Sequence, residues 1–330
     1  MLQIGQRQVG DHKQPFIIAE IGSNWTKIED CLASIQTAAA VGADAVKFQL
    51  FNFKSLYGIE PAKAPSWYNK ESELPVDWLN KLKSAADNAR IELMISAFGV
   101  DLLQAADRFV NCHKIASSET SHKDLLIAAA ATAKPVFMSC GGCTPADINL
   151  ALGALGGVTT ILNYCVSSYP APDSDLFTID LLRQYSPMVG FSDHSLDYRY
   201  LPRAACFHHK AVAIEKHLTC IRATTPDSPH SLKPHQFKVM VDLLRGRLTT
   251  GIIPAESEED MILRHKRRMV AAKEIAAKES FANGSNTLAA RSVLPTSDQV
   301  SPYAAEALNG NMAKKGYKPG DCISTLELNR

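Results

Sequence analysis

Two lysines of this chain lie within apolar segments, where a charged side chain needs a partner. Lys47 stands in the run Ala-Val-Lys-Phe and Lys114 in the run His-Lys-Ile-Ala. Lysine is rarely buried unless it is paired. Two such ammonium groups could bind an anion that carries both phosphate and carboxylate groups. The hydroxyls of Ser117, Ser139 and Ser192 could donate to the same anion, which is why we adopt this interpretation.

Two other interpretations of these lysines stay open. They could form a salt bridge in the interior of a barrel, for example with Glu20 or Glu119. One of them could instead form a Schiff base with a carbonyl substrate, as in some barrel aldolases.

His194 and His217 each follow a short apolar run, and the acidic residues Asp193 and Glu215 lie beside them in the sequence. Two imidazoles with nearby carboxylates are typical of a divalent-metal site with open positions, which can activate a carbonyl group. The alternatives are an acid–base histidine or two satisfied polar side chains at the rim of a fold. We expect the other histidines, including His230, at the surface.

The segments that precede these side chains have the composition of β-strands. They are short, apolar and partly β-branched, as expected for parallel strands that are buried on both faces. We predict strands at residues 16–21, 45–48, 91–95, 113–116, 135–138, 160–164, 188–191 and 211–214. We predict helices at residues 29–41, 76–89, 102–109, 123–133, 146–155, 174–184, 200–208 and 235–247.

Eight strand–helix alternations favour an α/β fold of the (β/α)8 TIM-barrel type over an open doubly wound sheet. No G-x-G-x-x-G follows the first strand, which weakens a dinucleotide-binding interpretation. In a (β/α)8 barrel the C-terminal strand ends meet on one face, where the active site lies. Nearly every predicted strand of this chain ends in polar side chains, which indicates one shared site. In chain order they are Glu20, Lys47, Gln49, Ser96, Lys114, Ser117, Glu119, Ser139, Ser167, Tyr169, Ser192, Asp193, His194, Glu215, Lys216 and His217.

The bulk composition argues against several classes of function. The chain has 330 residues, 46% of them hydrophobic, and a net charge of +1, so nothing favours nucleic acid or an anionic membrane as a partner. No apolar run is long enough to span a bilayer, and the polar start has no signal-peptide core. The eight cysteines are scattered, so we expect a reducing, cytoplasmic location. Cys140 and Cys143 have C-x-x-C spacing without a second pair nearby, and we interpret them as packed residues.

The composition changes after the last predicted barrel helix. We predict a catalytic barrel over residues 1–250, a linker over residues 251–266 and a second domain over residues 267–330. The basic run at residues 264–268 is expected to be a solvated face. Turn pairs such as Asn283-Gly284 indicate short strands in the second domain.

Together, these residues lie in motifs that resemble those of the sialic acid (N-acetylneuraminate) synthase family. Each motif is short, but the combination is specific and covers nearly the whole chain. The motifs lie at residues 16–22 (FIIAEIG), 42–49 (GADAVKFQ), 114–117 (KIAS), 134–139 (KPVFMS), 165–172 (CVSSYPAP), 189–194 (VGFSDH), 214–217 (IEKH), 226–227 (PD) and 231–234 (SLKP). Residues 267–323 resemble the antifreeze-like (SAF) domain of that family.

The resemblance implies a transferase of carbohydrate biosynthesis. It would condense phosphoenolpyruvate (PEP) with an open-chain N-acylated hexosamine, N-acetylmannosamine by default, to give a nine-carbon 2-keto acid and phosphate. Mn²⁺ or Mg²⁺ on His194 and His217 would polarise the aldehyde. The residues implied for PEP are Lys47, Lys114, Ser117, Ser139 and Ser192. Further substrate contacts are assigned to Gln49, Glu119, Ser167, Tyr169 and Asp193.

Three carboxylates take the remaining roles that the resemblance implies. Glu20 and Asp227 would contact the sugar, and Asp227 would also handle protons, while Glu215 would support the metal site from behind the ligands. The resemblance further implies a domain-swapped homodimer. In it the SAF domain covers the barrel mouth of the partner subunit, and Arg291 reaches the N-acyl group there.

Several positions depart from the family pattern, and they concern the sugar more than PEP. They are residues 23–27 (SNWTK), residues 96–99 (SAFG), Ser167 and the residues that follow Arg291. The alternatives are therefore a related synthase that makes legionaminic or pseudaminic acid, or a Schiff-base aldolase of the barrel class. The SAF-like tail alone would suggest a non-catalytic sugar- or ice-binding protein. The complete set of Glu20, both lysines and both histidines argues for an enzyme.

Overall fold

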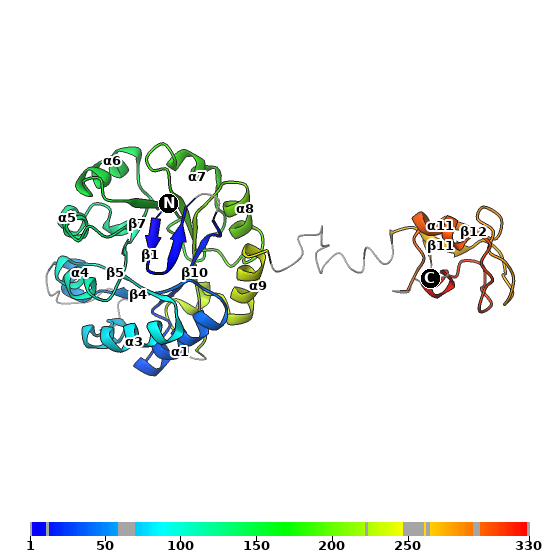
Figure 1. Ribbon diagram of the computed structural model, residues 1–330, viewed down its shortest axis with the longest axis horizontal. Helices are drawn as coiled ribbons and strands as arrows, with labels where there is room; N and C mark the ends of the chain where they lie inside the picture. The colour runs from blue at the N-terminus through cyan, green and yellow to red at the C-terminus, as the bar shows by residue number, and fades with distance from the viewer. Residues whose placement is uncertain are drawn as a thin grey trace. The chain divides into compact units, whose positions relative to one another are not determined.

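Figure 1 shows the computed structural model of the chain. The structure describes residues 2–10, 13–58, 70–221, 224–246, 261, 265–292 and 298–328. The chain divides into two compact units, Met1–Thr249 and Thr250–Arg330. Most of the predicted linker at residues 251–266 lies outside the described residues.

The first unit contains a closed barrel of eight parallel strands, which confirms the predicted (β/α)8 fold (Figure 1). Each strand pairs with the next one along the chain, and the last pairs with the first, where His217 lies opposite Glu20. The strands are β3 (Phe16–Gly22), β4 (Ala45–Leu50), β5 (Glu92–Ala97), β6 (His113–Ile115), β7 (Val136–Ser139), β8 (Thr160–Tyr164), β9 (Val189–Asp193) and β10 (Ala213–His217).

Helices form a ring around the barrel, as Figure 1 shows. Their inward faces pack on the outer faces of the strands, with Ile35 of α1 and Phe237 of α9 fully buried. The helices are α1 (Ile28–Ala40), α2 (Phe53–Tyr57), α3 (Leu79–Ala89), α4 (Val100–Asp107), α5 (Lys123–Ala131), α6 (Pro145–Ala154), α7 (Phe177–Leu182), α8 (Leu201–Phe207) and α9 (Pro234–Leu244).

A short N-terminal hairpin closes one end of the barrel. It consists of β1 (Leu2–Ile4) and β2 (Arg7–Val9), which pair antiparallel. Ile4 and Val9 are fully buried in one apolar cluster with Phe16 at the start of β3. This cluster fills the N-terminal end of the barrel interior, and in this fold the C-terminal end carries the site.

Four strands extend two or three residues farther toward that end than the sequence predicted. Gln49, Ser96, Asp193 and His217 all lie within strands rather than after them. Side chains alternate across a strand, so the position of each residue within its strand fixes whether its side chain points into the barrel or toward the helices.

The second unit has its own small core. It contains the antiparallel strands β11 (Arg268–Ala271) and β12 (Thr287–Ala290), and the short helix α11 (Ala305–Leu308). Met269, Phe281 and Leu308 are buried in one cluster. The assignment of this second unit as an SAF domain stays a prediction.

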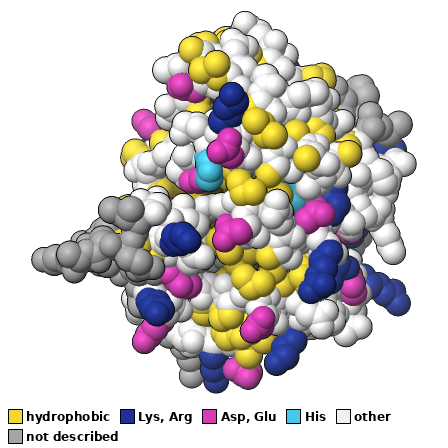
Figure 2. All heavy atoms as spheres, turned by 90° about the vertical axis from the view of Figure 1, so that its left-hand side faces the viewer, with side chains coloured by type: hydrophobic (Ala, Val, Ile, Leu, Met, Phe, Trp, Pro, Cys, Tyr) yellow, Lys and Arg dark blue, Asp and Glu magenta, His cyan; other side chains and the backbone are white. Residues whose placement is uncertain are grey.

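Charge is mixed on the face shown in Figure 2, where basic and acidic side chains are interspersed. Among the residues described, no helix has the length and apolarity that crossing a membrane requires.

Candidate active site

Two ammonium groups and two carboxylates meet inside the C-terminal end of the barrel. Lys47 Nζ lies 2.7 Å from Glu20 Oε2, its neighbour in the β3–β4 register. Glu215 Oε1 lies 3.3 Å from Lys114 Nζ and 3.7 Å from Lys47 Nζ. All four side chains are at most 6% exposed. The lysines predicted from sequence therefore come together, with Glu20 and Glu215, not Glu119, as their partners.

This network shifts the acidity of its members in opposite directions. Burial raises the pKa of Glu20, against the effect of Lys47. Burial also acts to raise the pKa of Glu215, but Lys114 and Lys47 outweigh it and lower that pKa to about 2. Burial lowers the pKa of Lys114 despite Glu215, whereas the two carboxylates outweigh burial at Lys47 and raise its pKa. Glu20 is thus the member best suited to carry a proton.

Hydroxyl groups surround the same network. Ser192 donates to Glu215 Oε1 at 2.8 Å, and Ser96 accepts from Lys47 Nζ at 3.1 Å. Ser139 is buried at the end of β7. Ser117 and Ser167 lie with their hydroxyl oxygens 3.2 Å apart, nearer the surface. The predicted serine donors are therefore distributed from the buried ion pairs to the mouth.

Asn163 is a polar residue of the interior that the sequence analysis did not select. It lies opposite Ser139 in the β7–β8 ladder, is fully buried, and its amide oxygen and nitrogen have no hydrogen-bond partner among the described residues. A Cβ added at Gly190 would lie 2.4 Å from its oxygen, so the glycine leaves room for this amide. In the sequence, the signal for Asn163 is a single amide side chain within a predicted buried strand, in the run Thr-Ile-Leu-Asn.

His194 is held in one orientation. Its Nδ1 lies 2.7 Å from the carbonyl oxygen of Val166, so Nδ1 carries the proton and Nε2 has the free electron pair. Tyr169 stacks on the imidazole at 4.2 Å between ring centroids, and its hydroxyl lies 3.3 Å from Nε2. Burial lowers the pKa of His194 to about 4, so the ring is neutral near pH 7.

A second imidazole group lies beside it. The ring centroid of His217 is 5.9 Å from that of His194 and 4.7 Å from that of His230. Among the described residues, His217, Asp227 and His230 form a group whose ligand atoms all lie within 4.8 Å of one another. His217 Nδ1 is buried without a hydrogen-bond partner among the described residues. This is the arrangement expected of residues that could hold a metal ion.

His230 is a correction to the sequence analysis, which expected it at the surface. It is 7% exposed, lies on a 3-10 turn (Ser228–His230), and its Nε2 is 3.3 Å from Asp227 Oδ1. The path of a loop after a strand cannot be deduced from local periodicity, so no pattern located this ring.

Gly22 brings Asp227 to the mouth of the barrel. Its φ is +56°, and a Cβ built there would lie 1.9 Å from Asp227 Oδ2, a separation that real atoms do not show. The same carboxylate oxygen accepts from the backbone N–H of Ser23 at 2.8 Å. Burial acts to raise the pKa of Asp227, but His230, His217 and this N–H outweigh it and lower the pKa.

Asp193 lies on the other side of the barrel wall. Its carboxylate accepts from Lys216 Nζ at 2.6 Å and from the backbone N–H of Ser195 at 2.9 Å, and both charged side chains are 0% exposed. Ser192 and Glu215, one position away in their strands, point inward instead. The structure thus pairs Asp193 with Lys216 and Ser195, and its substrate contact stays a prediction.

A cavity of about 490 Å³ opens at the mouth, and Gln49, Glu119 and Asp227 line it. Gln49 Nε2 donates to Glu20 Oε1 at 2.9 Å, which links this cavity to the ion-pair network. Arg291 is exposed in the second unit, directly after β12, and its predicted contact stays a prediction.

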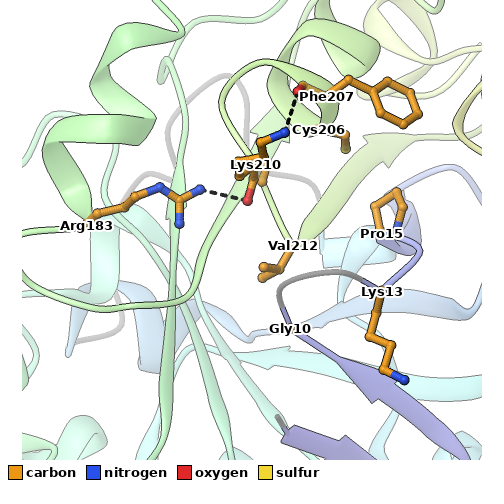
Figure 3. A pocket seen from close by; sticks show the side chains of 9 residues that line it. Gly10, Lys13, Pro15, Arg183, Cys206, Phe207, Lys210 and Val212 are labelled. Atoms are coloured by element: carbon orange, nitrogen blue, oxygen red, sulfur yellow. Dashed lines mark hydrogen bonds between the residues drawn. The ribbon is translucent and has the colours of Figure 1, made fainter.

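A cavity of about 540 Å³ lies at the opposite end, beside Pro15 and Val212, which precede β3 and β10 (Figure 3). Arg183 donates to the backbone oxygen of Lys210 at 2.7 Å, and Lys210 Nζ donates to that of Phe207 at 3.0 Å. These cations already have backbone acceptors, and in this fold the N-terminal face serves stability. We therefore take the C-terminal end of the barrel as the candidate active site.

Comparison with known proteins agrees with this geometry. Residues 34–249 match the model of the NeuB family. The chain is 33% identical over 282 residues to the spore coat polysaccharide biosynthesis protein SpsE of Bacillus subtilis (strain 168), covering 78% of this chain and 74% of that protein. It is 27% identical over 349 residues to pseudaminic acid synthase of Campylobacter jejuni subsp. jejuni serotype O:2, covering 98% of each chain.

A solved structure has the same fold. It is the N-acetylneuraminic acid (sialic acid) synthetase of Leptospira borgpetersenii serovar Hardjo-bovis in complex with citrate, with a TM-score of 0.67 and 28% identity. The match covers 79% of this chain and 94% of that one.

Proposed function

The chain belongs to the NeuB family, and on that premise we propose that it is a nonulosonic acid synthase, a transferase that joins PEP to an open-chain N-acylated hexosamine. The products would be a nine-carbon 2-keto acid and phosphate. The observation that carries this proposal is the meeting of two buried lysines with two neutral imidazoles at the strand ends of one barrel.

PEP carries phosphate and carboxylate, and Lys47 and Lys114 would bind these two groups, with Ser117, Ser139 and Ser192 as further donors. Glu20 and Glu215 keep the ammonium groups in place before the substrate arrives. C3 of the enol would then bond to the aldehyde carbon of the sugar. Water would add at C2, and phosphate would leave by C–O cleavage together with the bridging oxygen.

Proton transfer follows from the opposite pKa shifts in the site. Glu20, whose pKa is raised, is suited to donate a proton to the aldehyde oxygen as it becomes a hydroxyl. Asp227, whose pKa is lowered, is a carboxylate near pH 7 and is suited to accept a proton from the attacking water or to hold a sugar hydroxyl. Tyr169 and Ser167 border the same mouth and would contact substrate.

A divalent cation, Mn²⁺ or Mg²⁺, fits this set of residues. His194 presents Nε2 because the carbonyl of Val166 holds its Nδ1. His217 Nδ1 is buried without a hydrogen-bond partner among the described residues, and His230 Nε2 lies beside Asp227. We propose His194 and His217 as ligands, with Asp227 and His230 as further donors. A cation bound there supplies Lewis-acid polarisation of the acceptor aldehyde.

One observation favours a second chemistry. The pKa of Lys114 is lowered by burial, and a lysine with a lowered pKa is the group that forms a Schiff base. A Schiff-base aldolase would be inactivated by borohydride in the presence of substrate and would be insensitive to EDTA. Its lysine would not need the paired Lys47 or the imidazoles.

The test is a screen of PEP consumption across N-acylated hexosamines, with the product mass measured. The acceptors include N-acetylmannosamine and those that lead to legionaminic and pseudaminic acids. We expect phosphate release that needs Mn²⁺, the sugar and His217, and a product that retains all carbons of both substrates. Intact PEP with every acceptor would overturn the proposal, and EDTA-resistant, borohydride-sensitive turnover would favour the aldolase.

The second unit would complete the site in a homodimer. We propose that it is an SAF domain that covers the barrel of a partner subunit, where Arg291 would contact the N-acyl group. The exposure of Arg291 at the end of β12 is compatible with that contact.

A further inference from the structure

The cavity at the barrel mouth has an apolar side that the chemistry above does not use. Phe51, Leu56, Tyr57 and Phe98 line it, and we name these four residues the aromatic wall. Phe51, Leu56 and Phe98 are only partly buried and Tyr57 is exposed, so apolar surface is available to a ligand. An apolar wall beside a few polar groups is the usual composition of a small-molecule site.

The barrel itself positions this wall. Phe51 directly follows β4 and Phe98 directly follows β5, and the Phe98 N–H donates to the carbonyl oxygen of Leu50 at 3.0 Å, which extends the β4–β5 ladder. The two rings meet edge to face, 5.9 Å apart between centroids. The wall is therefore built on strand ends, and these two rings have fixed positions relative to the ion-pair network.

The polar side of the cavity consists of acceptors and uncharged groups. Glu119 and Asp227 contribute carboxylates, and Gln49 joins the cavity to Glu20. No lysine or arginine is among the described residues that line it. A phosphate or carboxylate group on a ligand would therefore meet the like charge of Glu119 and Asp227.

From these contacts we infer that the aromatic wall selects the acceptor sugar by its far end, favouring a methyl or acyl group there over a hydroxyl and rejecting a phosphate. This inference rests on the proposed function, because it assigns the cavity to the acceptor. A hydroxyl against Phe51 and Phe98 would lose its hydrogen bonds to water without replacement. A methyl group would bury apolar surface instead.

Three acceptors that differ only at C6 test the inference: N-acetylmannosamine, its 6-deoxy analogue and its 6-phosphate. Initial rates of phosphate release from PEP with Mn²⁺ give kcat/KM for each; with the 6-phosphate, only the phosphate derived from PEP is counted. We expect kcat/KM for the 6-deoxy analogue to be roughly 10-fold higher than for N-acetylmannosamine. We expect the 6-phosphate to be at least about 100-fold poorer than N-acetylmannosamine.

Two variants at one position separate selection from folding. Phe98→Ser should reduce the ratio of kcat/KM for the 6-deoxy analogue to kcat/KM for N-acetylmannosamine to about 2-fold or less. The matched control Phe98→Leu should keep most of this ratio. Equal use of the hydroxyl and methyl acceptors by the unmodified enzyme, or efficient use of the 6-phosphate, would overturn the inference alone. An equal loss of kcat/KM for both neutral acceptors in Phe98→Ser would also overturn the inference. Absence of PEP consumption with all three acceptors would overturn the inference, and its absence across the wider screen would overturn the proposed function as well.

Discussion

At the scale of single residues, the site is a balance of two buried ammonium groups and two buried carboxylates. Glu20 and Lys47 are adjacent across one pair of strands, whereas Lys114 and Glu215 reach each other across the barrel. Each ammonium group has a carboxylate beside it, so an entering anion must bind in competition with these carboxylates. Before the anion binds, the carboxylates compensate the buried positive charge.

Removing one ammonium group should affect PEP before it affects the sugar. We expect Lys114→Met to lower kcat/KM for PEP by roughly 100-fold or more, because a buried charge partner is lost. Lys216→Met is the matched control, since Lys216 also forms a buried ion pair, with Asp193, but outside the interior network. It should lower the free energy of unfolding by about 3–5 kcal/mol and leave KM for PEP unchanged. Equal effects of both variants on KM would contradict a binding role for Lys114.

Glu215 should make part of the stability dependent on pH. Its pKa in the folded chain is about 2, below its ordinary value of 4.5. The unfolded chain therefore takes up more protons than the folded one as the pH falls through this window, and stability is lost between about pH 4.5 and 2. Over that window the free energy of unfolding should fall by roughly 3 kcal/mol less in Glu215→Gln than in the unmodified protein. Urea unfolding at several pH values measures this, and parallel pH profiles for both proteins would contradict it.

The sequence located most residues of the site but not which side of a strand each one faces. Lys47, Lys114 and Glu215 were identifiable because charge within a buried strand is costly. For Asp193, β9 was predicted to end before it, and the resemblance implied a substrate contact. The strand includes it, and the alternation of side chains turns it toward Lys216.

At the scale of elements, Gly22 is where the end of β3 meets the loop after β10. It combines a left-handed backbone with a contact that only a hydrogen atom permits. The glycine thus sets how closely Asp227 approaches Glu20.

We expect Gly22→Ala to lower kcat/KM by roughly 100-fold through displacement of Asp227, besides a cost of about 1–2 kcal/mol for the backbone. The control is Gly156→Ala, because Gly156 has a φ of +60° and no atom within 4 Å of an added Cβ. It should have the same backbone cost and full activity. Steady-state kinetics with urea unfolding separates the two effects, and an active Gly22→Ala enzyme would show that Asp227 is not positioned in this way.

The barrel strands were predictable because each is a short apolar run buried on both faces. The N-terminal hairpin was not, because only Ile4 and Val9 of its strands are fully buried and the sequence around them is polar. Helix α2 was also missed, since five residues are too few to show a helical period.

At the scale of the whole molecule, the proposed exchange of second units between two chains makes a distinct prediction. Arg291→Ala should raise KM for the acceptor and leave KM for PEP unchanged, because only the sugar carries an N-acyl group. His217→Asn should be inactive through its own barrel. Mixed dimers of the two variants contain one barrel with an intact His217 and an intact Arg291 from the partner. At acceptor concentrations well below the KM of Arg291→Ala, co-expressed chains should therefore turn over faster than either variant alone. Absence of this complementation would contradict a shared site.

The measurement closest to the central claim follows the bridging oxygen of PEP. PEP labelled with ¹⁸O between C2 and phosphorus is incubated with enzyme, Mn²⁺ and the best acceptor of the screen, and both products are analysed by mass spectrometry. The account predicts that the released phosphate carries the label and that the nine-carbon acid carries none. Label retained in the acid, or phosphate released without an acceptor, would contradict it.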